Sequence, residues 1–126
     1  MNMTKRELID ICLSFNATYE DYPFDEVAAV IRHSGNKKMF ALIAHDKANR
    51  LYINLKCDPI EADFLRGAFA DVKPGWHMNK THWNTVYTDG DVPDEELRRM
   101  IEHSYDLIKP KIKKSRKTGV TNDENR

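Results

Sequence analysis

The residues best suited to chemistry lie together between positions 73 and 84, in the segment KPGWHMNKTHWN. This segment holds both tryptophans of the chain, two lysines and two histidines, and it has no acidic residue. Aromatic rings interleaved with cations can stack on nucleic-acid bases and neutralise phosphates at the same time. The segment therefore predicts a nucleic-acid-binding site with seven candidate residues: Lys73, Trp76, His77, Asn79, Lys80, His82 and Trp83.

The residue types in this segment suggest different roles and leave alternatives open. We expect Lys73, Lys80 and His82 to contact phosphates and Trp76 to stack on a base. Trp83 can instead fill the core, with its indole N–H bonded to a backbone carbonyl.

Two other interpretations are open for the same segment. Asn79 can have a purely structural role and hold a turn through an Asx-type hydrogen bond. The stretch from Asn79 to Trp83 can also line a pocket for a protein or a small molecule. In that interpretation the last helix closes the pocket, and Ser104 and Tyr105 supply polar groups.

Motifs of catalysis and metal binding are missing from the sequence. It has no phosphate-binding glycine loop, no nucleophile elbow and no zinc-binding helix motif. Its five histidines do not cluster at metal-ligand spacing, and Cys12 and Cys57 are far apart, as expected of reduced, partly buried thiols. We therefore expect a non-enzymatic protein with no cofactor and no metal.

Local signals predict three helices. Thr4 and Glu7 have the spacing of a capping box, and an apolar stripe follows to about residue 16. Asp58-Pro59 can begin a second helix that ends near residue 69. Pro93 and three acidic residues open a third helix, which Pro110 ends. The predicted buried residues of the second and third helices are Ile60, Phe64 and Ala68, and Leu97, Ile101, Tyr105 and Ile108.

Strands are predicted between and after the first two helices. Residues 27–31, 39–44 and 51–56 are apolar or alternating and are separated by short turns, which favours an antiparallel meander. Residues 85–88 predict one further strand, whereas 18–26 form an acidic, aromatic-rich connection. The predicted order is α-β-β-β-α-β-α, an α+β fold with an antiparallel sheet and helices packed on one face.

Composition predicts one domain and a basic tail. The chain has 126 residues, 40% of them hydrophobic, and no apolar run long enough to span a membrane, so we expect a cytoplasmic protein, with a monomer favoured. Formal net charge is zero, but the last eighteen residues carry seven basic and two acidic side chains. We place the domain at residues 1–110 and a basic, flexible tail at 111–126.

The segment from Met78 to Gly90, with its Asn-Lys-x-His-Trp stretch and Asp-Gly turn, resembles the signature of the MmcQ/YjbR family, as does the later Ser104-Tyr105 pair. The resemblance implies a fold similar to CyaY, the bacterial frataxin, also described as a double wing. It also implies a DNA-binding role and no established catalytic residues. The positions that match the motif are Asn79, Lys80, His82 and Trp83.

Overall fold

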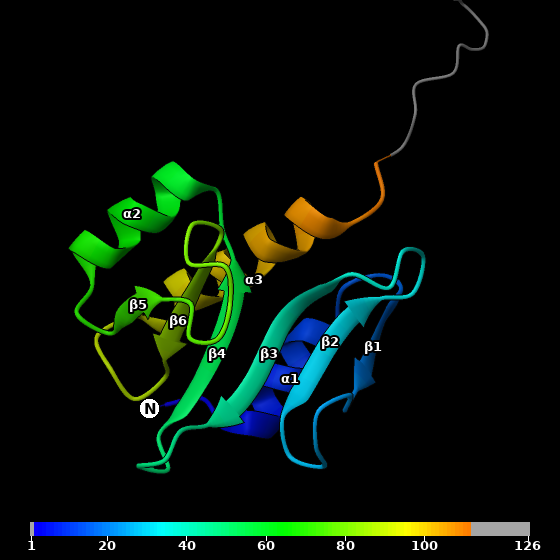
Figure 1. Ribbon diagram of the computed structural model, residues 1–126, viewed down its shortest axis with the longest axis horizontal. Coiled ribbons are helices and arrows are strands. Elements are labelled where there is room, and N and C mark those ends of the chain that lie inside the picture. Colours follow the sequence, from blue (N-terminus) through cyan, green and yellow to red (C-terminus); the bar gives the residue numbers. More distant parts are fainter. Residues whose placement is uncertain (1, 112–126) are drawn as a thin grey trace, which may run out of the picture.

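A single antiparallel sheet organises the chain. The computed structural model describes residues 2–111, which form three helices and six strands (Figure 1). The strands follow the order β1-β2-β3-β4-β6-β5 across the sheet. The elements in chain order are α1 (Lys5–Leu13), β1 (Thr18–Asp21), β2 (Ala29–His33), β3 (Met39–His45), β4 (Leu51–Lys56), α2 (Pro59–Ala68), β5 (Val72–Pro74), β6 (Trp83–Tyr87) and α3 (Asp94–Ile108).

The main core lies between the sheet and the helices. α1 and α3 cross behind the sheet in Figure 1, and α2 packs beside β5 at its end. The capping box of α1 is present, because the Thr4 hydroxyl accepts the Glu7 N–H and the Glu7 carboxylate accepts the Thr4 N–H. Three helices beside one six-stranded antiparallel sheet confirm the predicted α+β fold. The largest core side chains include Leu8, Ile31, Phe40, Ile43, Ile53, Leu55, Leu65 and Ile101.

Two strands were not predicted. β1 occupies the expected acidic connection, where it pairs with β2 from Thr18 opposite His33 to Asp21 opposite Val30. β5 has only three residues and pairs with β6 along the opposite edge of the sheet. Both are short edge strands, each held by backbone pairing to the strand that follows it in the chain. The edge also tolerates Pro74, since no second neighbour needs its missing N–H.

The predicted buried stripe of α2 is wrong. Ile60 is 83% exposed, Phe64 is 70% exposed, and Ala68 is exposed as well. The helix instead buries Ala62 and Leu65, which belong to the main core. Two apolar stripes share this short helix, and only contact with the sheet decides between them. The predicted stripe of α3 is confirmed, because all four of its residues are buried.

Within residues 2–111, no helix covers the second face of the sheet, which has a small core of its own. This open face buries Val30, Leu42, Ala44 and Tyr52. The loop of residues 75–82 passes over β4 and β6 on this side, in front of the sheet in Figure 1. The side of β4 that alternation predicts to be polar is therefore covered, and even Asn54 is buried.

Two further findings concern the described residues. Among residues 2–111, no helix is long and apolar enough to span a membrane, and no group of three or more potential metal-ligating side chains gathers in one place. The predicted basic tail lies, apart from Lys111, outside the described residues.

Candidate functional site

The loop of residues 75–82 is folded by its own motif residues. The Asn79 side chain accepts a hydrogen bond from the Thr81 N–H at 3.0 Å, which makes an Asx turn. The Lys80 ammonium donates to the Gly75 carbonyl at 3.2 Å, and the His82 carbonyl accepts the Cys57 N–H at 2.7 Å. Asn79 and Lys80 thus shape the loop.

Trp83 lies beneath this loop and is only 9% exposed. Gly75 crosses it so closely that a Cβ added to Gly75 would lie 2.7 Å from the Trp83 Cβ and 2.9 Å from its carbonyl oxygen. The Gly75 N–H donates to that same carbonyl at 2.8 Å. Trp83 is therefore largely covered and is poorly placed to stack on a ligand.

Arg66 of α2 anchors the far end of the loop. Its guanidinium donates to the Asn84 side chain at 2.7 Å and to the Trp83 carbonyl at 3.1 Å, and it also bonds the Lys80 carbonyl. Asn84 in turn donates to the carbonyl of Ala62, back on α2. The sequence offered no signal for this role, because Arg66 has the appearance of an ordinary polar helix residue.

Trp76 is held by its backbone while its indole stays accessible. Its N–H donates to the Thr85 hydroxyl at 2.8 Å, and its carbonyl accepts from the Asn54 amide at 3.2 Å. Thr85 and Asn54 are buried and bonded to each other at 2.5 Å. This pair fixes Trp76 to the sheet, while 41% of the Trp76 surface remains exposed. The sequence contains no signal for this anchor, because Asn54 stands at a position of β4 where alternation predicts an exposed polar residue.

A pocket of about 380 Å³ opens on this face beside Trp76. Its floor comes from Thr85 and Tyr87 of β6, and Lys73 of β5 lies along it. Lys47, in the turn between β3 and β4, lines it from another element. No ion pair among the described residues engages either lysine. The pocket therefore combines an accessible indole with two lysines and one carboxylate, that of Asp46.

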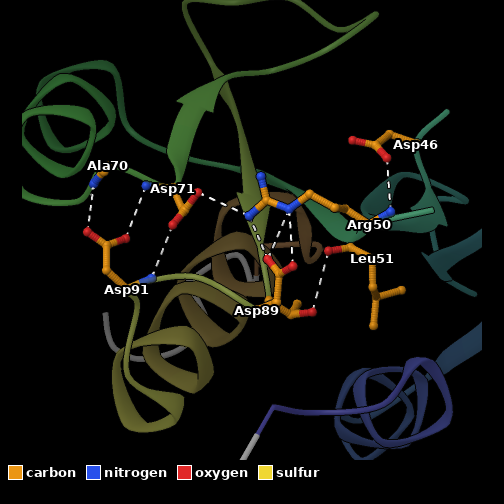
Figure 2. A network of polar contacts seen from close by, with 8 residues as sticks. Asp46, Arg50, Leu51, Ala70, Asp71, Asp89 and Asp91 are labelled. Atoms are coloured by element: carbon orange, nitrogen blue, oxygen red, sulfur yellow. Dashed lines mark hydrogen bonds and ion pairs between the residues drawn. The ribbon is translucent and has the colours of Figure 1, made fainter. Parts of the chain in front are cut away.

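A polar network holds Tyr87, which lines the pocket. The Arg50 guanidinium lies 4.1 Å from the centre of the Tyr87 ring, a cation–π contact. Figure 2 shows how Arg50 is held: it pairs with Asp89 at 2.5 Å and with Asp71 at 3.2 Å. Asp91 accepts the backbone N–H of Asp71 at 3.0 Å, which ties the turn after β6 to the start of β5.

This network and the pocket shift several pKa values in predictable directions. The hydrogen bonds from Arg50 lower the pKa of Asp89, and Asp89 in turn raises the pKa of Arg50. Partial burial, with the charge of Asp46 nearby, raises the pKa of Tyr87. Tyr87 is therefore a neutral phenol at physiological pH, and Arg50 is always charged.

The structure brings some of the seven candidate residues together and separates others. Lys73 and Trp76 line the pocket, and the His77 ring lies against the indole with their centres 4.3 Å apart. Lys80 instead lines a different hollow beside α2, together with Arg66. His82 is exposed but lines no pocket described here.

The pocket expected between the Asn79–Trp83 stretch and the last helix does not form. Ser104 is fully buried on the helical side of the sheet, where its hydroxyl donates to the Phe40 carbonyl at 2.6 Å and accepts the Lys56 N–H at 2.9 Å. The Tyr105 hydroxyl donates to the Asn16 carbonyl at 2.7 Å. Both side chains join backbone segments, and the sheet separates them from the pocket beside Trp76.

Comparison with known proteins gives a consistent set of relatives. A model of the YjbR family matches residues 13–107. The uncharacterised protein YjbR of Escherichia coli K12 is 34% identical over 103 residues, which cover 82% of this chain and 85% of that protein. The uncharacterised protein YyaQ of Bacillus subtilis is 30% identical over 118 residues, which cover 85% of this chain and 99% of YyaQ.

Solved structures have the same fold. A crystal structure of a Pseudomonas syringae protein superposes with a TM-score of 0.77 at 31% identity and covers 85% of this chain and all of that one. A crystal structure of a Deinococcus radiodurans protein with a DUF419 domain gives a TM-score of 0.75 at 34% identity, covering 83% of this chain and 78% of that one.

Proposed function

This chain belongs to the YjbR family, and we propose that it acts as a non-enzymatic nucleic-acid-binding module through the pocket beside Trp76. The observation that carries the proposal is the placement at one pocket of an exposed indole and of Lys47 and Lys73, which form no ion pair within residues 2–111. DNA is the nucleic acid that we propose as the partner.

Each part of the pocket suits a different part of a nucleic acid. The Trp76 indole offers a flat apolar surface to a base, and base–aromatic stacking does not depend strongly on base identity. Lys47 and Lys73 are compact positive charges that can neutralise phosphates. Lys80, which the sequence placed among the phosphate contacts, is not part of this site because its ammonium bonds the loop and lines another hollow.

The proposal of a non-enzymatic role rests on the ionisable groups at the pocket. One Asp46 carboxylate oxygen is already occupied, since it accepts the N–H groups of Ala48 and Arg50 at 2.9 Å each. Tyr87 is a neutral phenol whose raised pKa disfavours its use as a base. These groups suit binding better than proton transfer, which needs groups poised near the working pH.

Titration of labelled DNA at several salt concentrations tests this function. If Lys47 and Lys73 each neutralise one phosphate, log K falls against log salt with a slope of about −1.4 for single strands or about −1.8 for duplex. Lys73→Gln and Lys47→Gln should each lower the affinity and reduce the steepness of the slope by about half. Lys38→Gln is the matched control, because Lys38 is an exposed lysine in the turn at the other end of β3.

Two results would contradict the function. One is a lack of DNA binding at low salt by the folded protein. The other is binding whose affinity and salt slope are the same in Lys73→Gln as in the wild type. A larger loss of DNA affinity in Lys47→Gln than in Lys38→Gln would support the pocket as the contact surface, since both changes remove the same charge.

A second function, binding of a small aromatic anion, is favoured by the volume of the pocket. About 380 Å³ lies within the range of small-molecule sites. A thermal-shift screen with mononucleotides and aromatic carboxylates tests it, because a ligand that binds only the folded state raises Tm in proportion to the logarithm of its concentration. If none of these compounds changes Tm and the protein binds DNA, nucleic acid is the ligand.

A further inference from the structure

Resting on the proposed function, we infer that the pocket takes one unpaired base of a single strand, with the base stacked on Trp76 and the adjoining phosphates on Lys47 and Lys73. The ligand is thus single-stranded nucleic acid, and the duplex form is excluded from the pocket. The geometry that leads to this inference is the position of the accessible Trp76 indole along one side of an open hollow of about 380 Å³.

A paired base has no free face for the indole. In a duplex both faces of each base are stacked on neighbours, so only its edges are open to a protein. The Trp76 indole is anchored to the sheet through its backbone and forms one wall of a hollow. It can therefore reach only a base that has left the stack, and drawing a base out of a duplex costs unpairing energy.

The surroundings of Trp76 limit the site to one base. The His77 ring already lies against the indole, with a centre-to-centre distance of 4.3 Å and a tilt of 38°. Tyr52 meets the indole edge to face at 6.0 Å. The surface that remains is the one that lines the pocket, and Lys47 and Lys73 reach the same pocket from the β3–β4 turn and from β5.

The polar groups of the pocket predict weak base preference. The Thr85 hydroxyl accepts the Trp76 N–H and donates to Asn54, so it has little capacity left for a base edge. One carboxylate oxygen of Asp46 is engaged by two backbone N–H groups. Since stacking accepts any base, we expect oligonucleotides of different composition to bind with similar affinity.

The test compares four probes on the full chain: a labelled single-stranded DNA oligonucleotide, its duplex, a free mononucleotide and inorganic phosphate. The wild type is measured beside Trp76→Ala and Trp76→Phe. Both variants keep the backbone N–H and carbonyl that anchor position 76, so the loop should stay in place. Circular dichroism and the thermal midpoint check that each variant is folded.

We expect the single strand to bind more than about tenfold tighter than the duplex. Trp76→Ala should weaken single-strand binding roughly 5- to 150-fold, the range expected for loss of one base–aromatic stack, and Trp76→Phe should restore much of it. The mononucleotide should bind more weakly than the strand, and phosphate more weakly still.

Three results would overturn the inference. Duplex binding as tight as single-strand binding would refute it while leaving nucleic-acid binding intact. If folded Trp76→Ala bound the single strand with unchanged affinity, no base would be stacked on Trp76. A mononucleotide that binds as tightly as the strand would make the ligand a small molecule. Failure of both DNA forms to bind would instead refute the proposed function itself.

Discussion

Replacement of Gly75 by alanine tests whether the loop of residues 75–82 is fixed against β6. The added Cβ would lie 2.7 Å from the Trp83 Cβ, 2.9 Å from its carbonyl oxygen and 3.1 Å from the Met78 Cβ. None of these atoms is the end of a flexible side chain, so the loop must move away from the strand. Overpacking of this kind costs about 1–3 kcal/mol of unfolding free energy.

Urea denaturation followed by far-ultraviolet circular dichroism measures this cost. With a typical urea dependence for a small domain, the midpoint should fall by on the order of 1 M. The displaced loop should also carry Trp76 away from the Thr85 hydroxyl that anchors it, so DNA binding should weaken in the same variant. The matched control is Gly67→Ala, because a Cβ at Gly67 in α2 meets no atom within 4 Å.

Only Gly75→Ala, and not Gly67→Ala, should lower the free energy of unfolding. Gly67→Ala should leave the protein as stable as the wild type or up to about 1 kcal/mol more stable, since alanine is the better helix former. If Gly75→Ala unfolds at the same urea concentration as Gly67→Ala, the close approach of the loop to Trp83 is wrong.

Three other predictions concern the framework. Gly90→Ala should destabilise the protein by about 1–3 kcal/mol in urea, because its Cβ would overlap the Asp71 carboxylate and lie 2.5 Å from the Asp71 Cβ; unchanged stability would contradict the close approach of Gly90 to Asp71. Ser104→Ala should cost about 1–3 kcal/mol in the same assay, since it leaves buried backbone groups of two strands unsatisfied, and a neutral effect would show that Ser104 is dispensable. Burial raises the pKa of Cys12 to about 12 and that of Cys57 to about 11, so both thiols should react slowly with a thiol reagent at pH about 7 and rapidly in urea; fast reaction of the native protein would contradict their burial.

The helices were predictable because their signals are local. The capping box at Thr4, the Asp58-Pro59 start and the Pro93 start each lie within a few residues of the helix they begin. The edge strands were not, because β1 (TYED) and β5 (VKP) are too short to show an apolar alternation, and only their pairing with β2 and β6 defines them. The buried side of α2 was also beyond prediction, since Ile60 and Leu65 are equally apolar and only the packing of the helix distinguishes them.

The candidate site was predictable in its centre but not in its extent. An acid-free run of tryptophans, lysines and histidines pointed to Trp76 and Lys73, which share the pocket. The path of the loop sends Lys80 to another surface, and no spacing rule in the sequence indicates that path. Lys47 comes from a turn twenty-six residues before Lys73, and only the fold brings the two together.

The most direct test of the proposed site uses the two tryptophans of the chain as separate reporters. In a nitrogen-15 correlation spectrum, a single-stranded oligonucleotide should shift the indole signal of Trp76 and the amides of Lys47 and Lys73. The indole signal of the covered Trp83 and the amides of α1 should stay in place. Binding that leaves the Trp76 indole unmoved, or that shifts α1 instead, would contradict the account.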